Sequence, residues 1–175
     1  MAERDTARAL VYAAENQWSA ALDRGGVIDF FGSKLTLPQQ KQFETIQAMQ
    51  SYCDGVMVNK RVMSRYPSAG SVVVRARAGQ AMAHYESVGQ TIAIPLSGTA
   101  GEPSWACREA VLLHELTHHL LFSSADRAAA AVAIHGSAFT TSMCWLVCEI
   151  LGSEAALVLQ GAYQGSGVIV GSYVD

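Results

Sequence analysis

The residues of this chain best suited to chemistry are His114, Glu115 and His118, in the order His-Glu-Leu-Thr-His. Residues four apart lie on one face of an α-helix, ~6 Å apart along its axis, so two such imidazoles can bind one Zn²⁺ at ~2.0–2.1 Å each. Glu115 is placed to act as a general base on a water that the metal activates. The pattern therefore predicts a helical zinc site with Glu115 as its catalytic group.

The motif lies inside an apolar stretch, formed by Val111, Leu112, Leu113, Leu116, Leu120 and Leu121. This pattern predicts a buried helix, and burying histidines and a carboxylate without partners or a metal would be costly. A core helix whose histidines only bond to protein groups is the alternative. His119 lies ~100° around the helix from His118, so we expect it to support the site or face solvent, not to bind the metal.

A catalytic zinc site needs three protein ligands and one open position. The metzincin pattern requires a glycine and a histidine where this chain has Leu121 and Ser124, which excludes that class. The thermolysin-like pattern requires a glutamate roughly 20 residues after the second histidine. None lies near Ala138, and Glu149 and Glu154 come later.

Two residues remain as candidates for the third metal ligand. Asp126 is close in sequence to the motif and falls in a predicted turn. His135 comes 17 positions after His118 (135 − 118), at the entrance of a predicted helix, with Gly136 allowing close approach of backbone. We therefore predict His135 as the ligand, the alternative being a histidine that faces solvent at a helix N-terminus.

The composition fits one globular domain over residues 1–175. Half of the 175 residues are hydrophobic and 15% are charged, which suits a chain with a large core. The net charge is −3, the pI is near 5.9 and no basic run occurs, so a general nucleic-acid binder is not expected.

The sequence indicates a cytoplasmic protein. Its first residues are charged, which does not suit a signal peptide, and its most apolar region, residues 128–151, is interrupted by polar residues, which argues against a membrane span. The four cysteines form no C-x-x-C pair, and we interpret them as buried thiols in a reducing compartment. They are Cys53, Cys107, Cys144 and Cys148.

Hydrophobic periodicity and turn residues predict an α+β fold, a small and mostly antiparallel sheet packed on helices that include the His-Glu-x-x-His helix. The predicted helices run from Asp5 or Thr6 to about Leu22, from Pro38 onward, through the motif to Phe122, from His135 to Gly152, and from Ser153 to Tyr163. A hairpin is predicted at residues 27–37. Residues 164–175 are Gly-rich and are expected to form a loose tail, although residues 168–170 could dock.

Three strands are predicted before the motif helix, at residues 71–78, 81–85 and 91–95, as a meander whose last strand forms an edge at Pro95. Thr91, Ile92, Ala93 and Ile94 would then bind an extended peptide by strand addition, with an ordinary edge strand as the alternative.

An oxyanion donor is expected near the metal. The candidates are His84, Tyr85, His119 and Tyr163. His84 and Tyr85 alternate along a strand, so at most one of them faces the site.

Two features together resemble the core of SprT-like (Spartan-type) zincins. They are His114-Glu115-x-x-His118 and the later His135-Gly136-x-x-Phe139 that opens an apolar helix. The whole chain is also similar to a family of HExxH metallohydrolases from actinobacteria and their bacteriophages, over residues 7–15, 31–38, 75–86, the motif helix and residues 152–157. The resemblance implies a zincin-like fold, zinc ligands His114, His118 and His135, and Glu115 as the base.

We therefore expect a zinc-dependent metallohydrolase that cleaves peptide bonds in a peptide or protein substrate, with Zn²⁺ as its cofactor and no membrane partner. One alternative is a zinc-bound regulatory or interaction protein with little or no hydrolytic activity. A globular domain without a metal is the other.

Overall fold

The computed structural model describes residues 7–79, 82–96, 105–124 and 134–171. These residues form six α-helices and two small β-sheets, which confirms the predicted α+β class. The chain divides into two compact units, residues 41–125 and residues 1–40 together with 126–175. Within the described ranges, no helix has both the length and the apolar character needed to cross a membrane.

Helix α4 (Glu109–Phe122) is the central element of the 41–125 unit, and a 3₁₀ turn at Trp105–Cys107 precedes it. Leucines 112, 113 and 116 on this helix have no exposed surface. Glu109, in its first turn, accepts hydrogen bonds from the backbone N–H (2.8 Å) and Nζ (3.0 Å) of Lys41. This carboxylate ties residue 41 to the helix and also opposes the positive end of the helix dipole.

Two shorter helices, α2 (Ile46–Met57) and α3 (Lys60–Arg65), belong to the same unit. The prediction that the second helix starts at Pro38 is wrong, because α2 begins only after Thr45, whose side chain accepts a hydrogen bond from the N–H of Ala48. Such a capping oxygen satisfies one of the free N–H groups at a helix start, and residues 38–45 form no helix.

The three-stranded sheet of this unit has the order β3 (Val73–Arg77), β5 (Thr91–Pro95), β4 (His84–Glu86). Strand β5 runs parallel to β3 and antiparallel to β4, so the strands do not form the predicted meander. The physical reason is burial: Ile92, Ala93 and Ile94 have no exposed surface, and an uninterrupted apolar run is typical of a strand covered on both faces. The last strand in the sequence is therefore the middle one.

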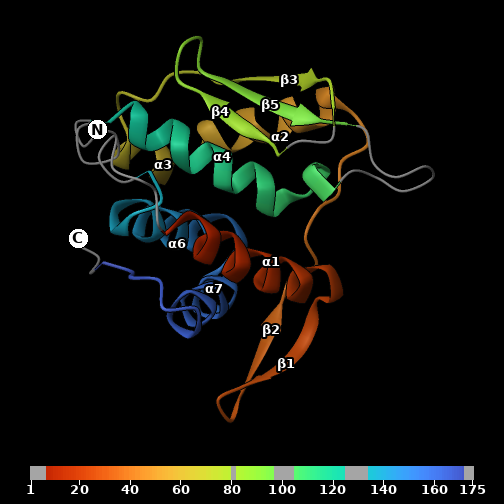
Figure 1. Cartoon of the computed structure of the whole chain (residues 1–175), viewed down its shortest axis with the longest axis vertical. Helices are drawn as coiled ribbons and strands as arrows, with labels where there is room; N and C mark the ends of the chain where they lie inside the picture. Colours follow the sequence, from red (N-terminus) through yellow and green to blue (C-terminus); the bar gives the residue numbers. More distant parts are fainter. Residues whose placement is uncertain (1–6, 80–81, 97–104, 125–133, 172–175) are drawn as a thin grey trace. The chain divides into compact units, whose positions relative to one another are not determined.

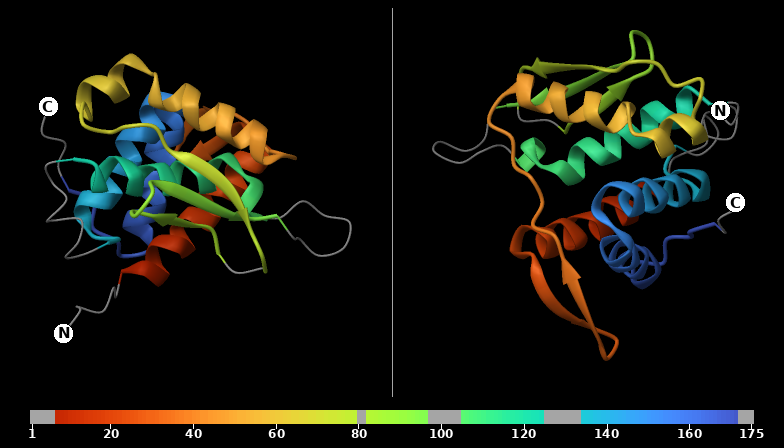
Figure 2. Two further views of the ribbon diagram at one scale, coloured as in Figure 1. Left: turned by 90° about the horizontal axis from the view of Figure 1, so that it is seen from above. Right: turned by 180° about the vertical axis from the view of Figure 1, so that it is seen from behind.

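Helices α2 and α4 pack on this sheet, α2 along β3 and α4 along β4 (Figures 1 and 2). Gln50 of α2 donates a hydrogen bond to the carbonyl of Val72 (2.9 Å) and accepts one from the N–H of Val74 (2.7 Å). Its amide thus occupies backbone groups on the outer edge of β3, where an added strand would otherwise pair.

The other unit consists of α1 (Arg8–Arg24), the hairpin β1 (Gly26–Phe30) and β2 (Ser33–Leu37), α6 (Ser137–Leu151) and α7 (Ser153–Gly165). Helix α7 packs against α1 and α6, and the indole of Trp18 donates to the carbonyl of Ala155 (3.0 Å). The hairpin extends from the end of α1 (Figure 1), as predicted. At Gly161 a Cβ would lie 2.5 Å from the tip of the Phe30 ring, so any larger residue there would force that ring to shift.

Of the two expectations for the tail, a loose chain is wrong for residues 166–171, and the docking of residues 168–170 on the helices is confirmed. Thr140 Oγ1 donates to the carbonyl of Ile169 (2.7 Å), the N–H of Gly171 donates to Thr141 Oγ1 (2.9 Å), and Val168 is buried. Residues 172–175, the predicted cap at residues 5 and 6, and Asp126 lie outside the described residues.

Candidate metal centre

His114 and His118 face each other on one side of α4. Their Nε2 atoms are 3.2 Å apart, and the side chains are 3% and 7% exposed. Two nitrogens bound to one tetrahedral zinc at 2.0–2.1 Å would be ~3.3 Å apart. The separation that the helix imposes on the two imidazoles therefore fits a shared zinc ion.

Glu115 follows the first of these histidines and precedes the second by three residues, and it is only 3% exposed. Residues three apart are neighbours on a helix surface, so the carboxylate lies on the face next to the two imidazoles. A carboxylate beside a metal position, on a helix that excludes bulk water, can hold and move a proton during hydrolysis.

His135 lies just before α6 and is 4% exposed, which rules out the alternative of a solvent-facing histidine. Its imidazole lies against two aromatic rings, with centroid distances of 5.4 Å to Tyr12 and 5.1 Å to Phe139. The guanidinium of Arg8 lies 5.5 Å from the centre of the Tyr12 ring. These rings restrict the orientation of the imidazole.

One ligand nitrogen from each of His114, His118 and His135 lies within 4.8 Å of the others. The three residues form a buried group that could hold a metal ion, as the sequence predicts. Three imidazoles are also a donor set found in catalytic zinc sites that keep an open position.

His119 has a different role from its neighbour His118. Its Nε2 donates to the carbonyl of Gly70 (2.9 Å), so Nδ1 is the acceptor for the hydroxyl of Tyr85 (3.0 Å). Burial lowers the pKa of His119, and the bond to Gly70 partly opposes this. The imidazole thus links α4 to β4 and to the loop before β3, a contact that no sequence pattern indicated.

The candidate oxyanion donors lie in three different places. Tyr85 faces α4, with its ring 5.9 Å from that of Phe122 and its hydroxyl on His119. Tyr163 is fully buried in the other unit, where its hydroxyl donates to Glu15 Oε1 (2.5 Å) and burial raises its pKa well above the usual value. His84 lies on the opposite face of the sheet from Tyr85.

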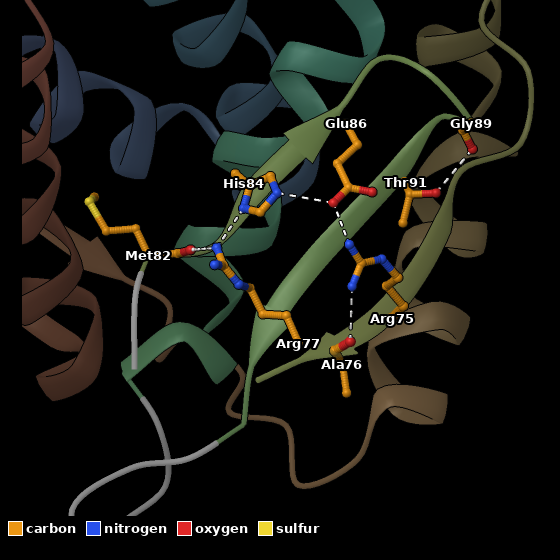
Figure 3. Close-up of polar contacts among 8 residues, drawn as sticks. All are labelled: Arg75, Ala76, Arg77, Met82, His84, Glu86, Gly89 and Thr91. Atoms are coloured by element: carbon orange, nitrogen blue, oxygen red, sulfur yellow. Dashed lines mark hydrogen bonds and ion pairs between the residues drawn. The ribbon is translucent and has the colours of Figure 1, made fainter. Parts of the chain in front are cut away.

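On that outer face His84 belongs to a polar network (Figure 3). Arg77 donates to its Nδ1 (2.7 Å), so Nε2 carries the proton and donates to Glu86 Oε1 (3.1 Å). Arg75 pairs with the same Glu86 oxygen, and this bond chiefly lowers the pKa of Glu86. These side chains face solvent, so His84 is separated from the buried histidine group by the sheet.

The expected edge position of Thr91, Ile92, Ala93 and Ile94 is wrong. Strand β5 pairs with β3 on one side and β4 on the other over these residues. Its backbone groups are therefore shared between two neighbouring strands and cannot accept a third by strand addition.

Comparison of the chain with protein-family models, curated proteins and solved structures finds no match. The class of the site therefore rests on its own residues, which are a buried group of three histidines that could hold a metal ion and a carboxylate on the same helix as two of them.

Proposed function

We propose that this protein is a zinc-dependent metallohydrolase with a zincin-like core that cleaves peptide bonds. His114, His118 and His135 hold the metal, and Glu115 is the general base. One observation carries the proposal: two imidazole nitrogens lie 3.2 Å apart on a buried helix, with a buried carboxylate between them in sequence. A core helix without a metal has no need of three ionisable side chains in so small a volume.

Zinc held by three neutral imidazoles supplies a Lewis acid that activates water and polarises the substrate carbonyl. Glu115 accepts a proton from the attacking water as the water oxygen bonds to the carbonyl carbon. The same carboxyl group then returns the proton to the leaving nitrogen as the C–N bond breaks. The peptide and one water thus become an acid and an amine, and Glu115 ends in its starting state.

An extended substrate would pair with β4 rather than β5. Strand β5 is in the middle of the described sheet, and Gln50 occupies the outer edge of β3. Strand β4 is the remaining edge, and it packs against α4, which carries the two histidines. Strand addition there would place a peptide backbone alongside the helix that holds the metal ligands.

The test combines metal analysis with a peptide library. Purified protein should contain about one zinc per chain and should cleave members of a proteome-derived library. Glu115→Gln should keep the metal and lose about 10²–10⁴-fold in kcat, because only the base is removed. Glu44→Gln, on the surface of the same unit, is the control and should be unaffected.

Full activity of Glu115→Gln on a proven substrate would refute the mechanism. Stoichiometric zinc with no cleavage of any peptide would favour a zinc-bound interaction protein, and no bound metal would favour the globular domain without one.

A further inference from the structure

The unit that contains His135 has an apolar pocket of about 430 Å³. It is lined by Ala7 and Leu10 at the start of α1, residues 135–137 at the entrance of α6, and residues 167–169 after α7. Apart from His135, none of the described residues in its wall is ionisable. Its size and lining are typical of a site that binds an apolar group, with few polar atoms to orient it.

The wall formed by residues 167–169 is held in place by hydrogen bonds. Thr140 Oγ1 donates to the carbonyl of Ile169 (2.7 Å), and the N–H of Val168 donates to the carbonyl of Tyr163 (2.9 Å). Gly171, just beyond, donates its N–H to Thr141 Oγ1 (2.9 Å). The pocket is therefore formed before any ligand binds, and a ligand would not have to order its wall.

His135 belongs both to the pocket wall and to the histidine group. Because a Zn–N bond is only ~2.1 Å long, a metal ligand in the wall puts the pocket within about one side chain's length of the metal. In a peptidase, the side chains at this distance belong to the residues that flank the bond being cut. Leu10, Val168 and Ile169 contribute apolar side chains to the pocket wall.

We propose that this pocket receives a bulky apolar side chain of the substrate, on a residue next to the bond that is cut. This inference rests on the proposed function, and it adds the substrate class: peptides with leucine, phenylalanine or a residue of similar size beside the cleavage site. A small residue there would leave the pocket unfilled, and a charged one would lose its hydration without gaining a partner.

The first test compares peptides that differ only at this residue. Wild-type protein should cleave leucine or phenylalanine substrates about 10–100-fold more efficiently, in kcat/KM, than the alanine substrate. Leu10→Trp fills the pocket. This variant should lower the kcat/KM ratio between the leucine or phenylalanine substrate and the alanine substrate by at least about 10-fold. Leu157→Trp is the matched control, because Leu157 and Leu10 are both 46% exposed and only Leu10 lines the pocket.

The second test needs no hydrolysis. L-phenylalaninamide, with glycinamide as the control, is titrated into the wild-type protein while methyl NMR signals are followed. Signals of Leu10, Val168 and Ile169 should shift with phenylalaninamide only, and those of Leu157 should not shift with either.

The two tests separate this inference from the proposed function. Methyl shifts without cleavage of any library peptide would show that the pocket binds an apolar side chain, and they would refute the proposed hydrolase function. Cleavage without an apolar preference, together with unshifted methyl signals, would refute the proposed role of the pocket. The proposed hydrolase function would then still be supported.

Discussion

At the scale of single residues, His135 is the ligand whose assignment depends most on the fold. His114 and His118 are brought together by one helix, whereas His135 reaches the group from before α6, held by the rings of Tyr12 and Phe139. Replacing it therefore tests whether the buried group acts as a three-nitrogen ligand set.

His135→Ala should lower zinc affinity by more than about 100-fold, since changes to groups that merely support a ligand already cost 10–100-fold. His84→Ala is the control, because His84 lies in the solvent-facing network of Figure 3 and should leave zinc affinity unchanged. Competition with a chromophoric chelator measures the zinc affinity of both variants. Equal affinities for the two variants would contradict the assignment.

Cys53 offers a second test at this scale. Burial, followed by the nearby charge of Asp54, raises the pKa of the Cys53 thiol to about 12. At pH 8 only about one Cys53 thiol in ten thousand would be ionised, and the thiolate is the reactive form. Iodoacetamide should therefore modify the partly exposed Cys148 well before Cys53 in the native protein.

Mass spectrometry of proteolytic fragments would follow this alkylation. Reaction of Cys53 should accelerate as the pH rises, and in urea all four cysteines should react. Alkylation of Cys53 as fast as Cys148 at pH 8 would show that the α2 core opens freely.

At the scale of elements, the sequence predicted what depends on local patterns. The β1–β2 hairpin and the helices after His135 and Ser153 lie where turn residues and helical periodicity put them. The predicted start of α2 at Pro38 is wrong, because Pro38 and Thr45 are both residue types that favour a helix start. In the structure only Thr45 caps the helix. Strand order was also wrong, because pairing partners are distant in sequence.

Gln50 gives an element-scale prediction about the edge of β3. Gln50→Leu removes the partners of two backbone groups, the carbonyl of Val72 and the N–H of Val74. The free energy of unfolding should fall by about 1–3 kcal/mol, since a partly buried backbone group without a partner is costly. Urea denaturation measures the change.

Gln47→Leu, on the exposed face of the same helix, should stay within about 0.5 kcal/mol of the wild type. Gln50→Glu replaces the donor to Val72 and Asp54 by a carboxylate that faces their oxygens, so it should also be less stable than the wild type. If Gln50→Leu and Gln47→Leu were equally stable, the amide would not be protecting the strand edge.

At the scale of the whole molecule, metal binding and stability are linked, because an ion that binds only the folded chain stabilises it. Free zinc at about 100 times its dissociation constant should add about 2.7 kcal/mol to the free energy of unfolding. For a chain of 175 residues this raises Tm by about 5–10 °C.

Differential scanning calorimetry of chelator-treated protein, with and without zinc, measures this shift. His114→Ala and His118→Ala should abolish it, because each removes one of the paired nitrogens, while His84→Ala should retain it. An equal shift in the His114→Ala variant would place the stabilising zinc elsewhere.

The sequence by itself determined the α+β class, the motif helix and the pairing of His114 with His118, because residues four apart in a helix share a face whatever surrounds it. Tertiary structure decided which strand is central, where the tail docks, and that Tyr85 and Gly70 engage His119. These features depend on contacts between residues far apart in the chain. Local patterns of polarity and turn residues carry no information about such partners.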